Sequence, residues 1–203
     1  MKKLFNKVKE GEKMTLVSEN RSNKVMMFID LRHVSESMKV VETSTPFKLD
    51  YYRLAVQLVG SRELVAAYVF DTRKPYGEDD SSARFHDKLR HDGFRVIARE
   101  SFDNENKKQK EVDVAMACEM VVHALRDHYD VAIVVAGDRD FVPAVQHVQA
   151  AGKRVELAAF EKSASKVLIK VSDKYDDLHK MPLLAMKSPS DEESEDGEEA
   201  EAV

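Results

Sequence analysis

The segment VAIVVAGDRDF, residues 131–141, is the part of the sequence on which the fold prediction depends most. It begins with a continuous apolar run, which is typical of a strand buried on both faces of a parallel sheet. Gly137 then allows a sharp turn, and two acids, Asp138 and Asp140, follow at once. Open parallel sheets bind ligands beyond the carboxyl ends of their strands. The segment therefore predicts a central strand with two carboxylates at the ligand-binding edge.

The rest of the chain continues this alternation of strand and helix. We expect strands at 25–30, 63–71, 94–100, 131–137 and 154–160. We expect helices at 47–60, 83–93, 110–127, 138–152 and 163–178, and irregular structure at 31–46. Strands that alternate with helical segments form βαβ units, whose helices cover both faces of a parallel sheet. The prediction is an α/β fold, a three-layer α-β-α domain with a mainly parallel five-stranded sheet.

Charge divides the chain into three parts. Residues 188–203 contain eight acidic residues and no Lys or Arg, whereas residues 1–24 contain seven basic and three acidic residues. The formal net charge of -5 comes from the tail, because 32 basic and 29 acidic residues remain without it. The tail has almost no apolar residues to bury, which is typical of disorder. We predict a basic flexible arm at 1–23, a folded domain at 24–181 and an acidic disordered tail at 182–203.

Several protein classes are excluded by what the sequence lacks. Cys118 is the single cysteine, which excludes a disulfide framework, and its apolar helical neighbours predict that it is buried. No run of about 18 apolar residues indicates a membrane helix, and no apolar region of a secretory signal follows the N-terminal lysines. The sequence contains no P-loop, dinucleotide fingerprint or G-x-S-x-G nucleophile elbow. We expect a cytoplasmic protein with no membrane partner.

Two further acids occupy notable positions. Asp30 ends the apolar run VMMFID, and Asp113 lies near the predicted start of the helix at 110–127. Carboxylates gathered at strand ends repel one another unless a cation joins them. Hard divalent cations such as Mg²⁺ and Mn²⁺ prefer such oxygen ligands and can activate water for in-line attack. For Asp113 alone, compensation of the helix dipole is an open alternative.

Several segments, in this order, carry a resemblance to a known family. They are FID (28–30), KEVDVAMACEM (110–120), VVAGDRDFVPAV (134–145), RVELAAF (154–160) and SASKVLIKVSDKYDDL (163–178). Together they resemble the NYN domain, a branch of the PIN-like nucleases that includes LabA-like proteins. The resemblance covers about residues 24–180. It implies a PIN-like fold and a metal-dependent ribonuclease that uses Mg²⁺ or Mn²⁺ and acts on RNA.

The resemblance also implies roles for individual residues. By matching positions, the catalytic residues and metal ligands would be Asp30, Asp113, Asp138 and Asp140, with Glu119 as a weaker fifth ligand. Candidate RNA-binding residues are Lys110, which matches a family lysine, and Arg32, Arg73, Lys74 and Arg139, for which a solvated surface is the alternative.

The chain departs from the family pattern near the site. His33 stands at an Asn-like position and Arg32 adds a charge beside Asp30, while Ala136 and Arg139 replace small or hydroxyl residues. These departures leave a second hypothesis open, a catalytically weak or inactive NYN-fold module that binds RNA or a protein and regulates it. A homo-oligomer is also left open. A haloacid dehalogenase-type phosphatase ranks last, because Arg32 stands where that class has its second Asp.

Overall fold

The computed structural model describes residues 23–40, 49–73, 80–100 and 105–181. Most of the predicted basic arm and the whole predicted acidic tail lie outside the described residues. Lys74 also lies outside them. The side chains of Arg73 and of residues 105–110 are likewise not described. Within the described part, no helix has both the length and the apolar character needed to cross a membrane.

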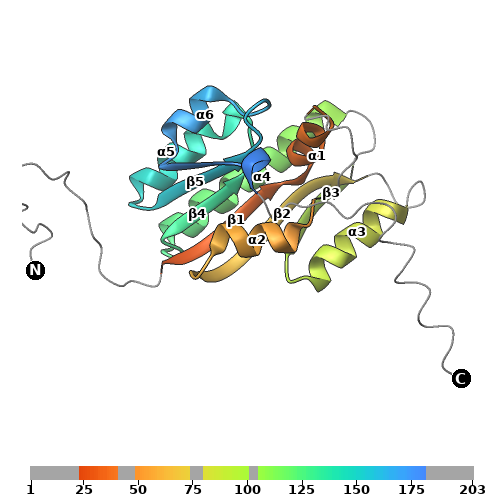
Figure 1. Ribbon diagram of the computed structural model, residues 1–203, viewed down its shortest axis with the longest axis horizontal. Coiled ribbons are helices and arrows are strands. Elements are labelled where there is room, and N and C mark those ends of the chain that lie inside the picture. The colour runs from red at the N-terminus through yellow and green to blue at the C-terminus, as the bar shows by residue number, and fades with distance from the viewer. Residues whose placement is uncertain (1–22, 41–48, 74–79, 101–104, 182–203) are drawn as a thin grey trace, which may run out of the picture.

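Strands and helices alternate along the chain as predicted (Figure 1). The strands are β1 (Lys24–Asp30), β2 (Glu63–Arg73), β3 (Arg95–Glu100), β4 (Val131–Val135), β5 (Arg154–Ala159) and β6 (Lys174–Asp177). The helices are α1 (Leu31–Val40), α2 (Tyr51–Val59), α3 (Asp80–His91), α4 (Glu105–Leu125), α5 (Val142–Ala150) and α6 (Lys166–Val171), with 3-10 turns η1 (Arg139–Phe141) and η2 (Leu178–Lys180).

All neighbouring strands of the sheet are parallel, in the order β3-β2-β1-β4-β5-β6. From β1 the chain builds outward through β2 to β3, then crosses back to place β4 on the other side of β1. The direction of winding therefore reverses between β1 and β4. In open α/β sheets this switch point leaves a crevice at the carboxyl ends of the strands, where ligands bind.

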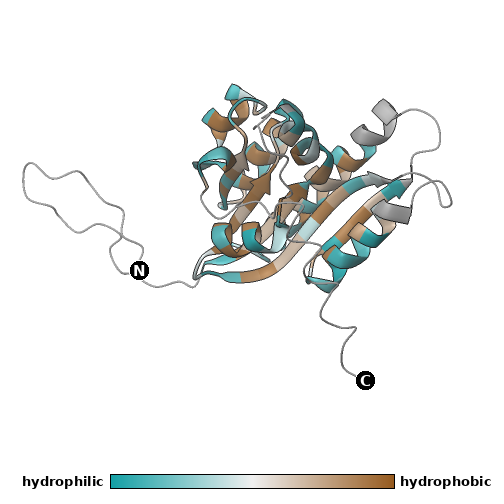
Figure 2. Cartoon of the chain, turned by 45° about the vertical axis from the view of Figure 1, so that its right-hand side comes forward, coloured by the Kyte–Doolittle hydropathy of each residue, from teal (hydrophilic) through white to brown (hydrophobic). Residues whose placement is uncertain are grey.

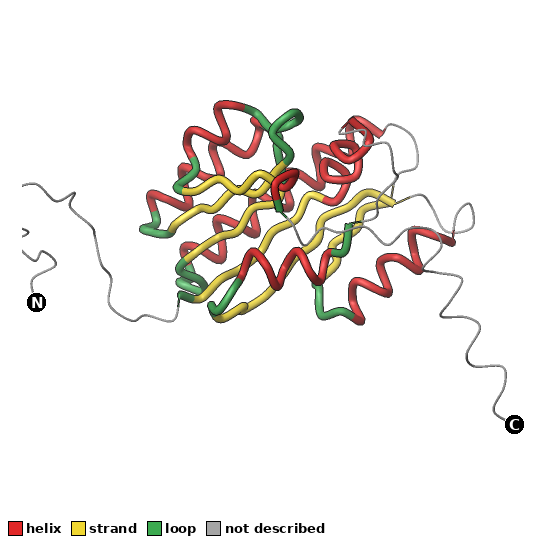
Figure 3. Tube along the Cα trace, viewed as in Figure 1, coloured by secondary structure: helices red, strands yellow, loops and turns green. Residues whose placement is uncertain are grey.

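The two faces of the sheet bury separate cores. Met27 and Ile29 of β1 face the core formed with α1, α2 and α3, whereas Met26 and Phe28 face the core formed with α4, α5 and α6. This alternation follows from the two-residue period of a strand. Figure 2 shows apolar residues concentrated on the strands, and Figure 3 shows the strands side by side between helices. The predicted three-layer α-β-α arrangement with a parallel sheet is confirmed.

The strand count was wrong, because the sheet has six strands rather than five. The predicted helix at 163–178 ends at Val171, and Ser172 is already extended. Asp173 then accepts a hydrogen bond from the backbone N–H of Val155 at 2.8 Å, which holds the chain against the edge of β5. The next four residues pair with β5 and form β6. Pairing at an open strand edge therefore prevails over the helical pattern.

Two other local predictions were also wrong. The segment expected to be irregular contains α1, which begins directly after Asp30 and buries Leu31 and Val34 on one face. Cys118 is exposed rather than buried. Helix α4 buries the stripe Val112, Met116, Met120 and Ala124. Cys118 lies on a different face of the same helix, because a residue two positions from a stripe member is rotated away from it.

Candidate metal and active site

Asp30 lies at the carboxyl end of β1, beside the switch point of the sheet. Its side chain is buried, and its Oδ1 accepts a hydrogen bond from the backbone N–H of His33 at 3.0 Å. Burial raises the pKa of Asp30 from 3.8 to about 7, although the hydrogen bond from His33 opposes the shift. The negative charges of Asp113, Asp138 and Asp71 add to the rise. A buried carboxyl group is thus surrounded by charges of its own sign.

Asp113 and Asp138 reach this region from two different elements. Asp113 is half-buried on α4, and Asp138 follows β4 after Ala136 and Gly137. Because α4 begins at Glu105, Asp113 lies two turns inside the helix rather than in its first turn. The dipole acts mainly within the first turn of a helix, so dipole compensation does not explain Asp113. The structure therefore places two of the other three predicted acids near the buried carboxyl group of Asp30.

Asp140 occupies a different place. Its side chain is exposed, as is that of Asp138, and its backbone N–H donates to Oδ1 of Asp138 at 2.9 Å, so that Asp138 caps the turn η1. Asp140 is not among the residues whose charges raise the pKa of Asp30. It lies two residues from Asp138, at the rim of the acidic group that Asp30, Asp113 and Asp138 form. Its role as a ligand stays a prediction.

Asp71 was missed by the sequence analysis. It lies near the end of β2, the strand next to β1, and its charge acts on both Asp30 and the buried hydroxyl group of Tyr51. Its Oδ2 contacts Nε2 of His86, a buried residue of α3, at 2.8 Å. The sequence contains a pattern that could have indicated Asp71: ELVAAYVFD, like VMMFID, is an apolar run that ends in an aspartate. None of the segments that carry the family resemblance includes that strand.

Glu119, predicted as a weaker metal ligand, contacts a histidine of its own helix. Its Oε2 is 3.1 Å from Nε2 of His123, and the same histidine nitrogen is 3.2 Å from the hydroxyl group of Tyr68. Helix α4 runs from the carboxyl edge of the sheet toward the opposite edge. Six residues separate Asp113 from Glu119, which is about 9 Å along a helix. Glu119 thus lies further along α4 than Asp113, and its role as a weaker ligand stays a prediction.

His33 and Gly137 contact each other at the switch point. A Cβ atom on Gly137 would clash with Nε2 of His33 and lie 3.0 Å from Cα of Ala164, so any larger residue would force the histidine ring to shift. Burial lowers the pKa of His33, and the negative charges of Asp138 and Glu36 oppose that shift. Nε2 of His33 is buried and has no hydrogen-bond partner among the described residues. The histidine at the Asn-like position thus packs against the strand end that carries Asp138.

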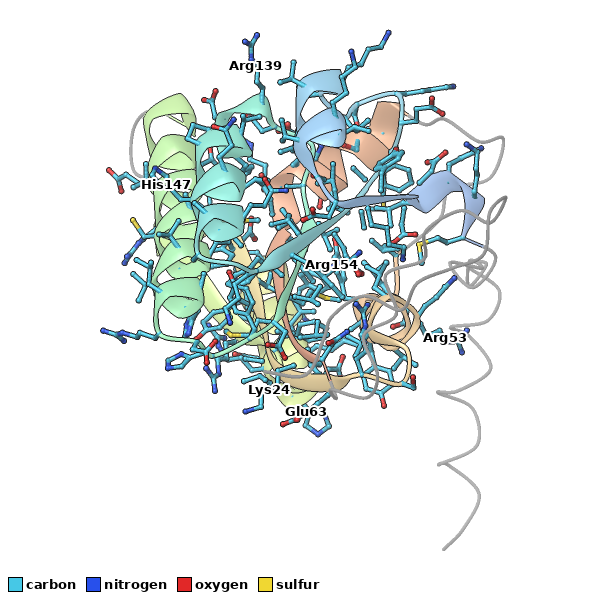
Figure 4. The ribbon with its side chains drawn as sticks, turned by 90° about the vertical axis from the view of Figure 1, so that its left-hand side faces the viewer. Lys24, Arg53, Glu63, Arg139, His147 and Arg154 are labelled. Carbon is cyan, nitrogen blue, oxygen red and sulfur yellow. The ribbon has the colours of Figure 1, made fainter. Side chains whose placement is uncertain are left out.

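The predicted RNA-binding residues have different surroundings. Nε of Arg32 pairs with Glu36 one turn later on α1, at 2.8 Å. Arg139 is exposed on η1, at the edge opposite Lys24 and Glu63, and its side chain points away from the body (Figure 4). Arg73 ends β2 and Lys110 lies in α4, and for both only the backbone is described. Arg139 is thus the candidate whose described position best suits contact with a polyanion.

The acidic group suits a hard divalent cation in donor type and in charge. Carboxylate oxygens are the ligands that Mg²⁺ and Mn²⁺ prefer, and a cation would offset the repulsion that raises the pKa of Asp30. In the described ranges, no three His, Cys, Asp or Glu side chains are spaced as ligands of one ion. The carboxylates would therefore have to move closer together to ligate a metal.

Comparison with known proteins agrees with this architecture. A crystal structure of a protein of unknown function from Vibrio parahaemolyticus superposes with a TM-score of 0.67 at 21% identity, covering 80% of this chain and 96% of that one. At this identity the similarity shows the fold alone. A search of curated proteins gives no match. The NYN domain model matches residues 24–179, nearly the whole of the described fold. The predicted family is confirmed: this chain belongs to the NYN domain family of the PIN-like superfamily.

Proposed function

We propose that this protein is a metal-dependent endoribonuclease that hydrolyses RNA phosphodiester bonds at the Asp30 end of the sheet. NYN domains are generally nuclease-like, which supports an enzyme acting on nucleic acid. The observation that carries the proposal is the burial of Asp30 among the charges of Asp113, Asp138 and Asp71. Such a group destabilises the folded protein unless something positive binds there, and functional sites are where such arrangements persist.

In this proposal Asp30, Asp113 and Asp138 hold Mg²⁺ or Mn²⁺. The ion, when bound, supplies Lewis-acid activation of water and of the scissile phosphate. Asp30 is the most buried of the three and provides a fixed oxygen, because its own Oδ1 is already oriented by the backbone of His33. Asp138 is held by the turn that it caps. Asp140 and Arg139 lie at the rim, where Asp140 can orient water and Arg139 can bind a phosphate.

The test combines metal binding and cleavage. Wild-type protein and Asp138→Asn are titrated with Mn²⁺ while the melting temperature is recorded, and both are then incubated with a pool of fluorescent single-stranded and hairpin RNAs. We expect Mn²⁺ to stabilise the wild type and to support cleavage, and both effects to be strongly reduced in the variant. The control is Asp87→Asn, which removes an exposed acid of α3. Unchanged cleavage in Asp138→Asn would refute the proposal.

A second candidate function is a non-catalytic RNA- or protein-binding module. It is favoured by His33, whose ring fills the space beside Gly137 at the position where the family has a small amide. RNA binding without cleavage by the wild type, in the presence of bound Mn²⁺, would support this module. Cleavage restored or increased in His33→Asn would show that the histidine limits the activity of an enzyme.

A further inference from the structure

A row of basic side chains that form no salt bridge with the described residues borders the acidic group on the β5 side. Lys166 and Lys170 are one turn apart on α6, both are exposed, and Lys162 is exposed in the turn before the helix. Four residues of helix span about 6 Å, so the two helical lysines lie on one face and in line with the helix axis. Arg139 of η1 adds a fourth exposed cation.

The three lysines have few acidic neighbours among the described residues. Neither α5 nor α6 contains an Asp or Glu. Nearby acids have other partners: Asp176 pairs with Lys174 at 2.8 Å, and Asp177 pairs with Lys180 at 3.1 Å. Asp173 accepts hydrogen bonds from Val155 and Gln149. Within the described residues, none of the four cations forms a salt bridge. Glu161, next to Lys162, lies 3.8 Å from Lys180, whereas Asp138 and Asp140 flank Arg139. Among the described residues, the three lysines are therefore the cations of this surface without an acidic partner.

The row is attached directly to the candidate site. Ser165 caps α6, and its backbone N–H donates to the carbonyl oxygen of Gly137 at 2.8 Å. Gly137 is the residue before Asp138, so one hydrogen bond connects the start of α6 to the strand end that carries the proposed ligand. Figure 4 shows α6 beside the turn that carries Arg139, at the same edge of the molecule. The lysines thus lead away from the acidic group along the outer side of α6.

We propose that Arg139, Lys162, Lys166 and Lys170 bind the phosphates of a single-stranded RNA on one side of the scissile bond. This inference rests on the proposed ribonuclease function and adds a path for the substrate. A flexible single strand can follow one helix face, and lysines bind its phosphates without reading sequence. The surface therefore contributes affinity for the RNA and orients it. We expect little base preference on this side of the cleavage point.

The test measures binding apart from cleavage. The full chain is mixed with a fluorescent single-stranded RNA of mixed sequence in EDTA, and the dissociation constant is measured at several concentrations of monovalent salt. The test variant changes Lys162, Lys166 and Lys170 to Gln. The control changes Arg53, Arg84 and Lys88 to Gln, three exposed cations of α2 and α3 in the opposite layer. Circular dichroism melting checks that both variants fold.

Each contact with a single-strand phosphate contributes about -0.7 to the slope of log affinity against log salt. We expect the lysine variant to bind roughly 100-fold more weakly at 0.1 M salt and to lose about 2 units of slope, since three such contacts are removed. The control should keep the wild-type slope. An equal loss in both variants, or no loss in either, overturns the proposed path.

Cleavage assays in Mn²⁺ separate this proposal from the one on which it rests. If the wild type cuts RNA but the lysine variant retains its salt slope, the path is wrong and the ribonuclease function stands. If the lysine variant loses slope but the wild type never cuts, the surface binds RNA and the catalytic proposal fails. If the wild type does not bind single-stranded RNA at all, the path is refuted.

Discussion

The acids at the two edges of the sheet differ in their partners. At the amino edge, buried Glu156 of β5 pairs with Arg62 at 2.9 Å, and Asp130 accepts a hydrogen bond from the backbone N–H of Lys24 at 3.0 Å. At the carboxyl edge, buried Asp30 receives a backbone hydrogen bond from His33, and the acids Asp113, Asp138 and Asp71 lie near it. Both edges belong to the same strands, so the difference does not arise from the fold itself.

This difference separates acids that stabilise the domain from acids that suit a ligand. A buried carboxylate that has a cationic partner contributes a defined geometry to the fold, whereas one without a partner disfavours the folded state. The free energy lost at the carboxyl edge can be recovered when a cation binds. The following predictions test whether the two edges respond oppositely to the same kind of substitution.

The largest effect is expected for Asp30→Asn, which keeps the oxygen that accepts from His33 and removes the charge. Cleavage should become undetectable, while the free energy of unfolding at pH 8 without divalent ions should rise by roughly 3–5 kcal/mol, because a pKa raised to about 7 disfavours the charged form by about 1.4 kcal/mol per unit. Urea denaturation measures the gain. Asp130→Asn at the amino edge is the control and should give no gain.

The raised pKa of Asp30 also predicts how the stability of the protein changes with pH. Between about pH 4 and pH 7 the folded state keeps a proton on Asp30 that the unfolded chain has lost, so this group makes the protein less stable as the pH rises through that window. Above pH 7 its contribution is constant. The difference in unfolding free energy between Asp30→Asn and the wild type should therefore be small at pH 4 and grow toward pH 8. A difference that shrinks with pH would contradict the proposed environment of Asp30.

At the amino edge, Arg62→Ala should have the opposite effect on stability. The substitution leaves Glu156 buried without its partner and also removes hydrogen bonds to the carbonyl oxygens of Leu58 and Val59 at the end of α2. We expect a loss of about 3 kcal/mol, measured by urea denaturation, with unchanged cleavage per folded molecule. Adding Glu156→Gln should recover part of the loss, because the uncompensated charge is then removed.

A smaller effect is expected for Gly137→Ala, which probes how closely the carboxyl edge is packed. The added methyl group meets the ring of His33 and the backbone at Ala164 and should destabilise the protein by about 2 kcal/mol. In the His33→Ala background the same substitution should cost less, because one of the two contacts is gone. Additive costs in a double-mutant cycle would mean that His33 does not limit the space at this position.

The smallest effect is expected for Glu119→Gln. Its carboxylate contacts His123 on the part of α4 beyond Asp113, so Mn²⁺ affinity and cleavage should stay within about twofold of the wild type. A Mn²⁺ titration followed by the RNA cleavage assay measures both. A loss comparable to that of Asp138→Asn would restore Glu119 as a ligand and require α4 to shift when metal binds.

The sequence predicted the features that depend on local pattern. Apolar runs identified five strands, and the acids that end VMMFID and follow VAIVVAG were placed at one edge of the sheet by the parallel topology alone. The segments KEVDVAMACEM and VVAGDRDFVPAV, with three others, carried the resemblance to the family, which the match over residues 24–179 confirms. Binary pattern and motif spacing were sufficient here, because strand direction and side-chain alternation follow from the backbone.

Other features depended on contacts between distant residues. The sixth strand pairs with β5 next to the hydrogen bond between Asp173 and Val155, and α1 packs Leu31 and Val34 into the core on one face of the sheet. Asp71 lies near the acidic group because β2 pairs with β1. Glu119 lies further along α4 than Asp113, on the part of the helix that contacts His123. The sequence by itself therefore determined the family, the layers and the acid-bearing edge. Only the tertiary structure decided which carboxylates meet there, because distance and burial set the electrostatic coupling that sequence spacing does not report.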